Sequence, residues 1–232
     1  MGGCTNCASK GGCSTRKGEE RELLAKLLPE LYPERRFGVI DDDARDGVPE
    51  KEGRRLARQA AALLKAPTFF RAGEPHEVCD YIYVLCVGRQ PCLFELRDAR
   101  SLDFQEGDAV REKYLRVALS SLARVTTLQE VSIELDREPS QGGEPGLFRL
   151  VERPSPGIYD PILLKRTRKL VELLVAAELT FLDFGLIENP PLGFEHGDYE
   201  ADYGQPPGIV NYLFYPQPPR AVATSYIPVQ AA

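Results

Sequence analysis

The chain has 232 residues, of which 43% are hydrophobic and 28% are charged, and its net charge is −6. This composition is typical of a globular protein, and no run of 18 apolar residues exists, so we expect no membrane span. We expect that the charge is not focused into a basic face, which argues against nucleic acid as a partner. The chain carries six cysteines and no visible secretory signal. We therefore expect a reducing, cytoplasmic setting, where clustered cysteines more often bind metal than form disulfides.

Residues 1–18 form a predicted cysteine-rich arm. Cys4, Cys7 and Cys13 follow the spacing C-x2-C-x5-C, with glycines at positions 2, 3, 11 and 12. The arm has almost no other apolar side chains, so three thiols there are not explained by a hydrophobic core. A C-x2-C pair lets two sulfurs converge on one centre, and the glycines allow the backbone to approach it closely. The arm therefore predicts a metal site that lacks one ligand.

Helices and short strands alternate over the next fifty residues. The leucine spacing predicts an amphipathic helix over 19–31, and a short strand is expected over 36–40. The acidic stretch 41–47 resembles part of a calcium loop, but it lacks the closing Glu and is interpreted as a solvated turn. An Ala- and Leu-rich helix is predicted over 50–65, followed by a strand over 68–71.

A second group of cysteines lies on two predicted strands. The β-branched and aromatic stretch 77–87 carries Cys79 and Cys86, and a second strand over 91–96 carries Cys92. A turn at 88–90 would place Cys86 and Cys92 near the same end of a hairpin. Seven residues separate Cys79 from Cys86, so the two side chains should lie on opposite faces. Cys86 and Cys92 are the better ligand candidates, and Cys79 is also consistent with an ordinary buried thiol.

The central region is predicted as a helix over 109–123, capped by Asp108. A strand that contains Leu115, Val117 and Leu119 is the alternative. Strands are expected over 128–135 and 147–151, and a Gly- and Pro-rich loop separates them.

The last predicted elements are a helix over 160–178 and a strand over 179–187. Residues 189–232 form a Pro-, Gly- and Tyr-rich tail that is expected to wrap over the domain or over a partner. A short internal similarity indicates two related β-α-β halves, 19–138 and 146–188. The predicted fold is thus α/β (or α+β), with a mixed sheet, flanking helices and an N-terminal cysteine-rich arm.

The spacing of Cys4, Cys7 and Cys13 resembles the three-cysteine part of the iron–sulfur loop in the large iron–sulfur subunit of respiratory NADH dehydrogenases. That loop has a histidine before its first cysteine, and no residue before Cys4 can take this role. The resemblance covers about ten residues and concerns the cofactor, not the fold. It implies an iron–sulfur cluster.

The expected cofactor is an iron–sulfur cluster, with zinc as the alternative, because four thiolates suit both. Structural zinc sites usually supply a second C-x2-C pair, which the downstream cysteines lack, so iron–sulfur is favoured. One of Cys86 or Cys92 would be the fourth ligand. The candidate metal ligands are Cys4, Cys7, Cys13, Cys86, Cys92 and, less favoured, Cys79.

Three functions are compatible with these patterns. The preferred one is an iron–sulfur electron-transfer or accessory subunit with a protein partner. The second is a zinc-stapled interaction protein whose tail docks a partner; the tail tyrosines are Tyr199, Tyr203, Tyr212 and Tyr215. The third is a thiol-based redox enzyme that uses Cys4 and Cys7. No phosphate loop, dinucleotide fingerprint or nucleophile elbow is present, and both His76 and His196 are interpreted as solvated. Catalysis and oligomeric state therefore stay open.

Overall fold

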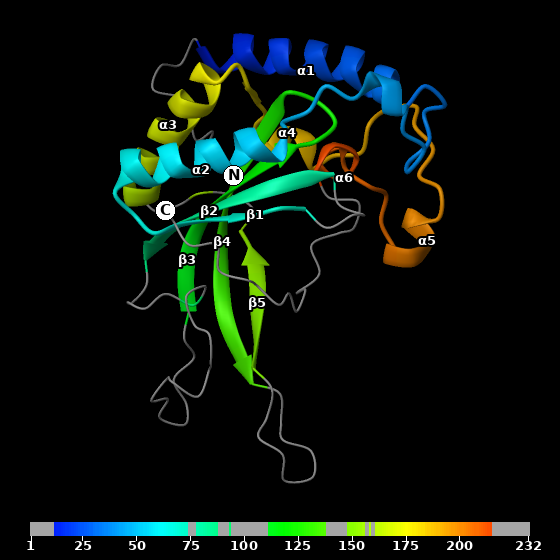
Figure 1. The fold of residues 1–232 in the computed structure, drawn as a ribbon. Helices are drawn as coiled ribbons and strands as arrows, with labels where there is room; N and C mark the ends of the chain where they lie inside the picture. The colour runs from blue at the N-terminus through cyan, green and yellow to red at the C-terminus, as the bar shows by residue number, and fades with distance from the viewer. Residues whose placement is uncertain are drawn as a thin grey trace, which may run out of the picture.

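The computed structural model describes residues 12–73, 78–87, 93, 111–137, 148–155, 158 and 161–214, and every structural statement concerns these residues. The helices are α1 (Gly12–Leu31), the 3-10 helix η1 (Asp42–Ala44), α2 (Glu50–Leu64), α3 (Pro161–Ala176), α4 (Phe184–Ile187), α5 (Tyr199–Tyr203) and α6 (Ile209–Leu213). The strands are β1 (Thr68–Arg71), β2 (Cys79–Val87), β3 (Arg111–Ser120), β4 (Val125–Arg137), β5 (Phe148–Pro154) and β6 (Thr180–Phe181) (Figure 1).

The described strands form one sheet in the order β1-β2-β3-β4-β5, with every neighbouring pair antiparallel. The short strand β6 adds to β4 in parallel, so that Val125 pairs with Thr180. A mixed sheet with flanking helices was predicted, and this part of the fold prediction is confirmed. The sheet runs without interruption through the two segments that were predicted as separate halves.

Helices α2 and α3 cover one side of the sheet, which we call the α2–α3 face. Gly53, Leu56, Ala57 and Ala60 are buried along one stripe of α2, at the spacing of a single helical face. They pack on alternate strand residues of the second core cluster, which include Ile82, Val84, Leu115, Val117, Leu119 and Leu128. Helix α3 contributes Leu163, Leu170, Val171 and Leu174 to the same cluster. The layer is almost entirely aliphatic, apart from Phe70 and Phe181.

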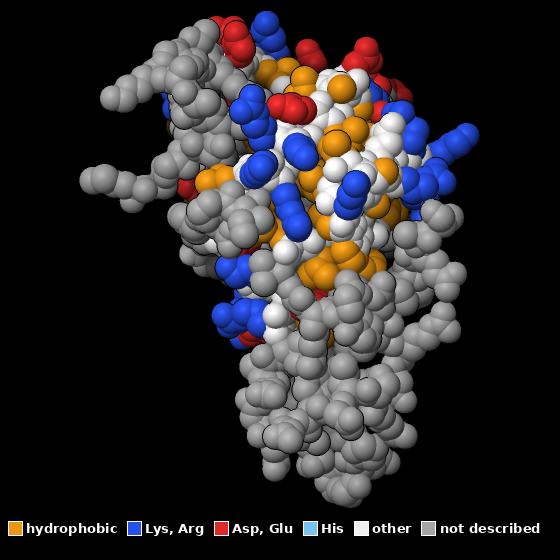
Figure 2. All heavy atoms as spheres, turned by 90° about the vertical axis from the view of Figure 1, so that its left-hand side faces the viewer, with side chains coloured by type: hydrophobic (Ala, Val, Ile, Leu, Met, Phe, Trp, Pro, Cys, Tyr) orange, Lys and Arg blue, Asp and Glu red, His pale blue; other side chains and the backbone are white. Residues whose placement is uncertain are grey.

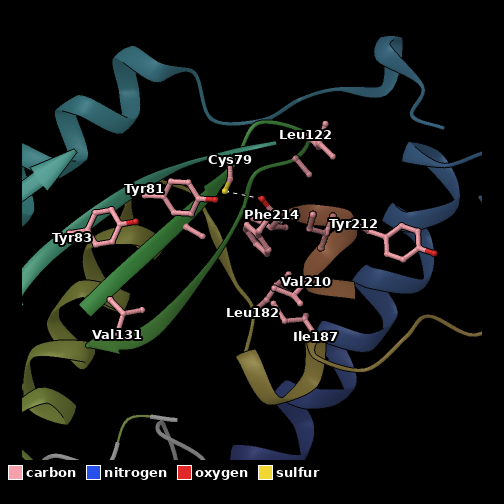
Figure 3. Packing of buried hydrophobic residues seen from close by; sticks show 14 of the residues in the cluster. Cys79, Tyr81, Tyr83, Leu122, Val131, Leu182, Ile187, Val210, Tyr212 and Phe214 are labelled. Atoms are coloured by element: carbon pink, nitrogen blue, oxygen red, sulfur yellow. Dashed lines mark hydrogen bonds between the residues drawn. The ribbon is translucent and has the colours of Figure 1, made fainter. Parts of the chain in front are cut away.

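The opposite side of the sheet, the α1–α6 face, is more aromatic. Its strand residues include Tyr81, Tyr83, Tyr114, Ala118, Val131 and Ile133. They share one core with residues of α1, α4, α6 and the loops next to them, including Leu24, Leu28, Ile187, Tyr212 and Phe214. Figure 3 shows how these groups converge from distant parts of the chain.

Several elements match their predicted positions. Helix α2, strands β1 and β2 and helix α3 lie within two residues of the predicted bounds, and β4 covers the predicted strand 128–135. Helix α1 begins at Gly12, seven residues before the predicted start, so it includes Cys13 in its first turn. None of the described helices is long and apolar enough to cross a bilayer.

The predicted helix over 109–123 is wrong, and the alternative strand is confirmed as β3. Its residues pair with β2 on one side and with β4 on the other. Leu115 and Val117 lie on the α2–α3 face, whereas Tyr114 and Ala118 lie on the α1–α6 face. The apolar residues of this stretch fit both a helical and a strand pattern. Pairing with two long strands decides between them, because tertiary context overrides local propensity.

Three other predictions needed correction. Residues 36–40 contain only an isolated bridge, between Arg36 and Glu195. The predicted strand over 179–187 is limited to β6, because Asp183 caps α4 by accepting a hydrogen bond from the Gly185 amide at 3.0 Å. Leu93 lies in a helical turn, whereas a strand was predicted over 91–96.

The C-terminal segment up to residue 214 packs into the core, although its sequence shows little periodicity. Its helix α6 begins with a local cap, in which the Gly208 amide donates to Asn211 Oδ1 at 2.8 Å. Tyr212 is fully buried, and its carbonyl oxygen accepts a 2.5 Å hydrogen bond from the hydroxyl of Tyr32. Residues 189–214 are thus part of the domain, and the rest of the predicted tail lies outside the described residues.

Candidate functional site

Cys79 and Cys86 lie on opposite faces of β2, as predicted. Cys79 belongs to the core of the α1–α6 face, whereas Cys86 packs against the core of the α2–α3 face. Next to Cys86, the pairing of β2 with β3 is irregular between Leu85 and Val87. Because the sheet separates the two sulfur atoms, Cys79 and Cys86 cannot ligate the same metal ion.

Cys79 has a structural role in this fold. Its side chain is 2% exposed, and its Sγ donates a hydrogen bond to the carbonyl oxygen of Phe214 at 3.0 Å (Figure 3). A cysteine in such surroundings behaves as a small hydrophobic residue with a weak donor. Metal binding at Cys79 would require opening of the core that joins β2 to the end of α6.

Cys86 lies beside α3 in a more polar environment and is partly exposed. Arg166 of α3 donates from Nη1 to the carbonyl oxygens of Leu85 and Cys86, at 3.2 and 3.4 Å. The thiol itself donates to the carbonyl oxygen of Val84 at 3.3 Å. Burial raises the pKa of the Cys86 thiol, and a hydrogen bond from Arg166 only partly opposes this effect. The neutral thiol is therefore favoured at neutral pH.

The other predicted ligands cannot be placed. The backbone of Cys13 lies in the first turn of α1, whereas Cys4, Cys7, Cys92 and the predicted turn at 88–90 lie outside the described residues. Among the residues that the structure describes, no three His, Cys, Asp or Glu side chains gather closely enough to hold a metal ion. The predicted cysteine site therefore stays a prediction.

The described residues do contain a buried polar network that sequence analysis missed. Arg116 on β3 donates from Nη1 to Glu152 Oε2 at 2.6 Å and from Nη2 to Gln129 Oε1 at 2.7 Å. The hydroxyl of Tyr83 donates to the other carboxylate oxygen of Glu152 at 2.8 Å, and Gln129 Nε2 donates to the Ser155 carbonyl oxygen at 3.1 Å. The network thus takes one side chain from each of the four strands β2 to β5.

Aromatic rings and a second carboxylate surround this network. The guanidinium carbon of Arg116 lies 5.8 Å from the centre of the Tyr81 ring, and that of Arg71 lies 4.8 Å from the same ring. Buried Glu112 accepts hydrogen bonds at Oε2 from the Leu93 amide at 2.8 Å and from the Tyr114 hydroxyl at 2.5 Å. The cationic and anionic groups are close partners in a region of low dielectric, so they hold one another in a fixed geometry.

The network is best explained as a device that fixes strand register. Tyr83, Arg116 and Gln129 are direct neighbours across β2, β3 and β4. A shift by one residue would move Arg116 to the aliphatic α2–α3 face and leave Glu152 as a buried, unpaired charge, which is strongly unfavourable. In the sequence, the only signal is that Glu112 and Arg116 interrupt an apolar strand. The partners of Arg116 could not be identified without the pairing.

The tail tyrosines of the predicted docking surface are in part core residues. Tyr199 and Tyr212 are buried and pack edge-to-face on Phe37. Burial raises the pKa of Tyr212 to about 12 and that of Tyr32 above its usual range, so both hydroxyls stay neutral at physiological pH. His196, which was predicted to be solvated, is half-buried, and its Nδ1 atom is buried without a hydrogen-bond partner. This arrangement corrects the idea that Tyr199 and Tyr212 contact a partner.

No protein-family model, curated protein or solved structure matches this chain.

Proposed function

We propose that the chain is a cysteine-ligated metal protein, an iron–sulfur electron-transfer or accessory subunit that works with a protein partner in a reducing, cytoplasmic setting. The observation that carries this proposal is the spacing of Cys4, Cys7 and Cys13 within ten residues, next to pairs of glycines. Three thiolates so close together suit a cluster or a metal ion better than any packing role.

The position of Cys13 supports this proposal. Cys13 is the second residue of α1, and the free amides of a first helical turn carry a partial positive charge. The amides of Gly11 and Gly12 precede Cys13 directly and could donate hydrogen bonds to cluster sulfurs, which would tune the redox potential.

The fourth ligand is proposed to be Cys86 or Cys92. Cys79 is left out, because its thiol is buried in the core and hydrogen-bonded to Phe214. Cys86 is partly exposed, but its raised pKa means that a metal would have to displace a proton that the site retains. This cost favours Cys92, provided that it can reach the arm.

Anaerobic purification followed by an absorption spectrum and analysis of iron, sulfide and zinc tests the proposal. We expect a brown protein with broad absorbance near about 400 nm, as for thiolate-ligated iron. Cys7→Ser should lose iron and sulfide together. Cys79→Ala is the matched control: it should keep the full metal content, although cavity formation lowers its stability by about 1–2 kcal/mol. Cys86→Ser and Cys92→Ser then identify the fourth ligand.

The alternative outcomes separate the hypotheses. A colourless protein with one zinc ion per chain, lost in Cys7→Ser, would replace the redox function by a zinc-stapled structure. Absence of any metal after anaerobic purification would overturn the proposal. Loss of metal in Cys79→Ala without loss of the fold would contradict the structural role assigned to Cys79.

A further inference from the structure

The outer surfaces of α2 and α3 are strongly basic. The two helices contain eight Lys and Arg residues and three Glu residues, although the whole chain has a net charge of −6. The exposed cations are Lys51, Arg54, Arg55, Arg58, Lys165, Arg168 and Lys169, and we call this surface the basic face. Figure 2 shows more Lys and Arg than Asp and Glu over the described part of this side. The sequence-based expectation that the charge is not focused is therefore wrong.

The fold joins the two helices into one surface. Arg124 donates from Nη2 to Glu52 near the start of α2 and to the Ala177 carbonyl oxygen just after α3, at 3.0 Å in both cases. The start of α2 thus lies beside the end of α3, and the helices are antiparallel neighbours. Their basic residues, which lie more than a hundred positions apart in the chain, therefore share one face.

The cations of the basic face are only partly neutralised. Arg54 pairs with Glu50 at 2.7 Å, and Arg168 pairs with Glu172 at 3.1 Å. Arg58, Lys165 and Lys169 form no ion pair with any residue that the structure describes. The face therefore keeps a positive charge that an anionic partner can neutralise.

The opposite side of the molecule is acidic. Residues 183–204 contain six Asp and Glu residues and no Lys or Arg. They lie beside the loop that leads to η1, because the Phe37 amide donates to the Glu195 carbonyl oxygen at 2.9 Å. Exposed Arg35, Arg36 and Arg45 lie in the same region, and Arg45 pairs with Asp42 at 2.7 Å, but the carboxylates outnumber them. The exposed carboxylates are Asp42, Asp43, Glu188, Glu195, Asp198, Glu200 and Asp202, and we call them the acidic face. In Figure 1, α5 lies on the right-hand side, away from α2 and α3.

Each face also exposes aliphatic side chains. On the acidic face, Leu192 is 97% exposed in a turn between Pro191 and Gly193, and the glycine has a positive φ of 74°. On the basic face, Leu63 and Val175 are 42% and 50% exposed. A leucine that is almost completely exposed gains nothing from the hydrophobic effect in the isolated chain, and such residues mark contact sites when charges surround them.

We propose that the basic face docks the acidic face of a second copy of this chain. The two surfaces are complementary in charge, and each contributes an apolar contact. A polyphosphate partner fits less well, because the carboxylates of Glu50, Glu52 and Glu172 are interspersed among the cations. In addition, none of the aromatic side chains that the structure describes is exposed for base stacking. A protein surface with mixed charges suits this pattern.

The geometry determines the form of the assembly. The two faces lie on opposite sides of one molecule, so the contact is heterologous. In a dimer, one copy keeps a free basic face and the other keeps a free acidic face, so further copies can add at both ends. Chains of copies should grow as the concentration rises. The attraction should weaken with salt, because the Debye length falls from about 30 Å at about 0.01 M to about 3 Å at about 1 M ionic strength. The assembly does not depend on a bound metal.

Sedimentation velocity of the full chain at both ionic strengths tests the proposal. We expect the weight-average mass to rise with concentration at low salt and to return to that of a monomer at high salt. Lys165→Glu/Lys169→Glu and Glu195→Lys/Glu200→Lys should each weaken self-association at least about tenfold. An equimolar mixture of the two variants should associate again, because the unaltered acidic face of the first variant can bind the unaltered basic face of the second.

The control keeps the size and sign of the charge change in Glu195→Lys/Glu200→Lys but moves it to another surface. Glu22→Lys/Glu30→Lys alters two exposed residues of α1 and should leave self-association unchanged, and far-UV circular dichroism confirms that each variant is folded. A chain that stays monomeric at low salt would overturn the proposal. So would self-association that both face-reversing variants leave intact, or a mixture that does not associate.

Discussion

The two faces of the sheet are stabilised in different ways. On the α2–α3 face, an aliphatic layer of Leu56, Leu115, Val117 and Leu170 separates sheet from helices. The ion pairs Lys113–Glu130 and Arg153–Glu134 lie on strands β3, β4 and β5, outside this layer. On the α1–α6 face, tyrosines and the buried Arg116–Glu152 pair lie on the strands themselves.

This difference shows what each kind of packing contributes. Aliphatic contacts are non-directional, so they give stability in proportion to buried area and tolerate small shifts. A buried ion pair with hydrogen bonds contributes little net stability, but every displacement of a partner is costly. The α2–α3 face therefore contributes non-directional hydrophobic stabilisation, whereas the polar pairs of the α1–α6 face fix the register of the strands.

The largest effect is expected from breaking the buried pair. Arg116→Met should lower the free energy of unfolding by about 3–5 kcal/mol, because Glu152 would keep a buried, uncompensated charge. The double variant Arg116→Met/Glu152→Met should recover more than half of this loss. Urea denaturation of the two single variants and the double variant gives the coupling free energy. A cost below about 1 kcal/mol for Arg116→Met would show that the charge is not buried as described.

A smaller loss is expected on the aliphatic face. Leu170→Ala should cost about 3 kcal/mol, because it removes a fully buried side chain and leaves a cavity under α3. Leu170→Met keeps most of the volume and should cost less than about 1.5 kcal/mol. Because Leu170 and Arg116 lie on opposite sides of the sheet, their effects should add, and strong coupling between them in urea denaturation would contradict the independence of the two faces.

The smallest effect is expected at the exposed ion pairs. Hydrogen bonding to Arg153, together with the charge of Arg111, lowers the pKa of Glu134 below its ordinary value of 4.5. The resulting stability is present above pH 4.5 and is lost as the pH falls through the lowered pKa. Both arginines are about 60% exposed, so Glu134→Gln should cost only about 0.5 kcal/mol at pH 7. The free energies of unfolding of the variant and the wild type should differ less at pH 3 than at pH 7. An equal difference at both pH values would show that the ion pairs of Glu134 are not the cause.

The sequence was sufficient for elements with an unambiguous period. Helix α2 has a regular stripe and β1 has a compact β-branched and aromatic run, so both were predicted within a residue or two. Strand β3 was predicted as a helix, because its apolar residues satisfy both periods until β2 and β4 pair with it. The C-terminal segment was underestimated for a different reason. Tyr212 and Phe214 are buried by residues of α1 and β2 that lie far away in the chain.

The candidate sites differ in the same way. Spacing along the chain was enough to predict a metal arm at Cys4, Cys7 and Cys13, and alternation was enough to separate Cys79 from Cys86. The Arg116–Glu152 pair depends on the register of three strands, and the basic face depends on two helices that become neighbours only in the folded chain. The Arg116–Glu152 pair leaves no local pattern in the sequence. The basic residues cluster within each helix, as in residues 165–169, but the sequence does not show that the two clusters share one face.

The contact between Tyr32 and Tyr212 has a consequence for the order of folding. Tyr32, which directly follows α1, hydrogen-bonds a residue that lies 180 positions later in the chain. During synthesis, the apolar stripe of α1 lacks part of its native cover until α6 has left the ribosome. A core that closes through such distant contacts folds slowly, because the loop entropy must be overcome before the contacts form. Nascent chains that stop before Ile209 should therefore be the ones that molecular chaperones retain longest.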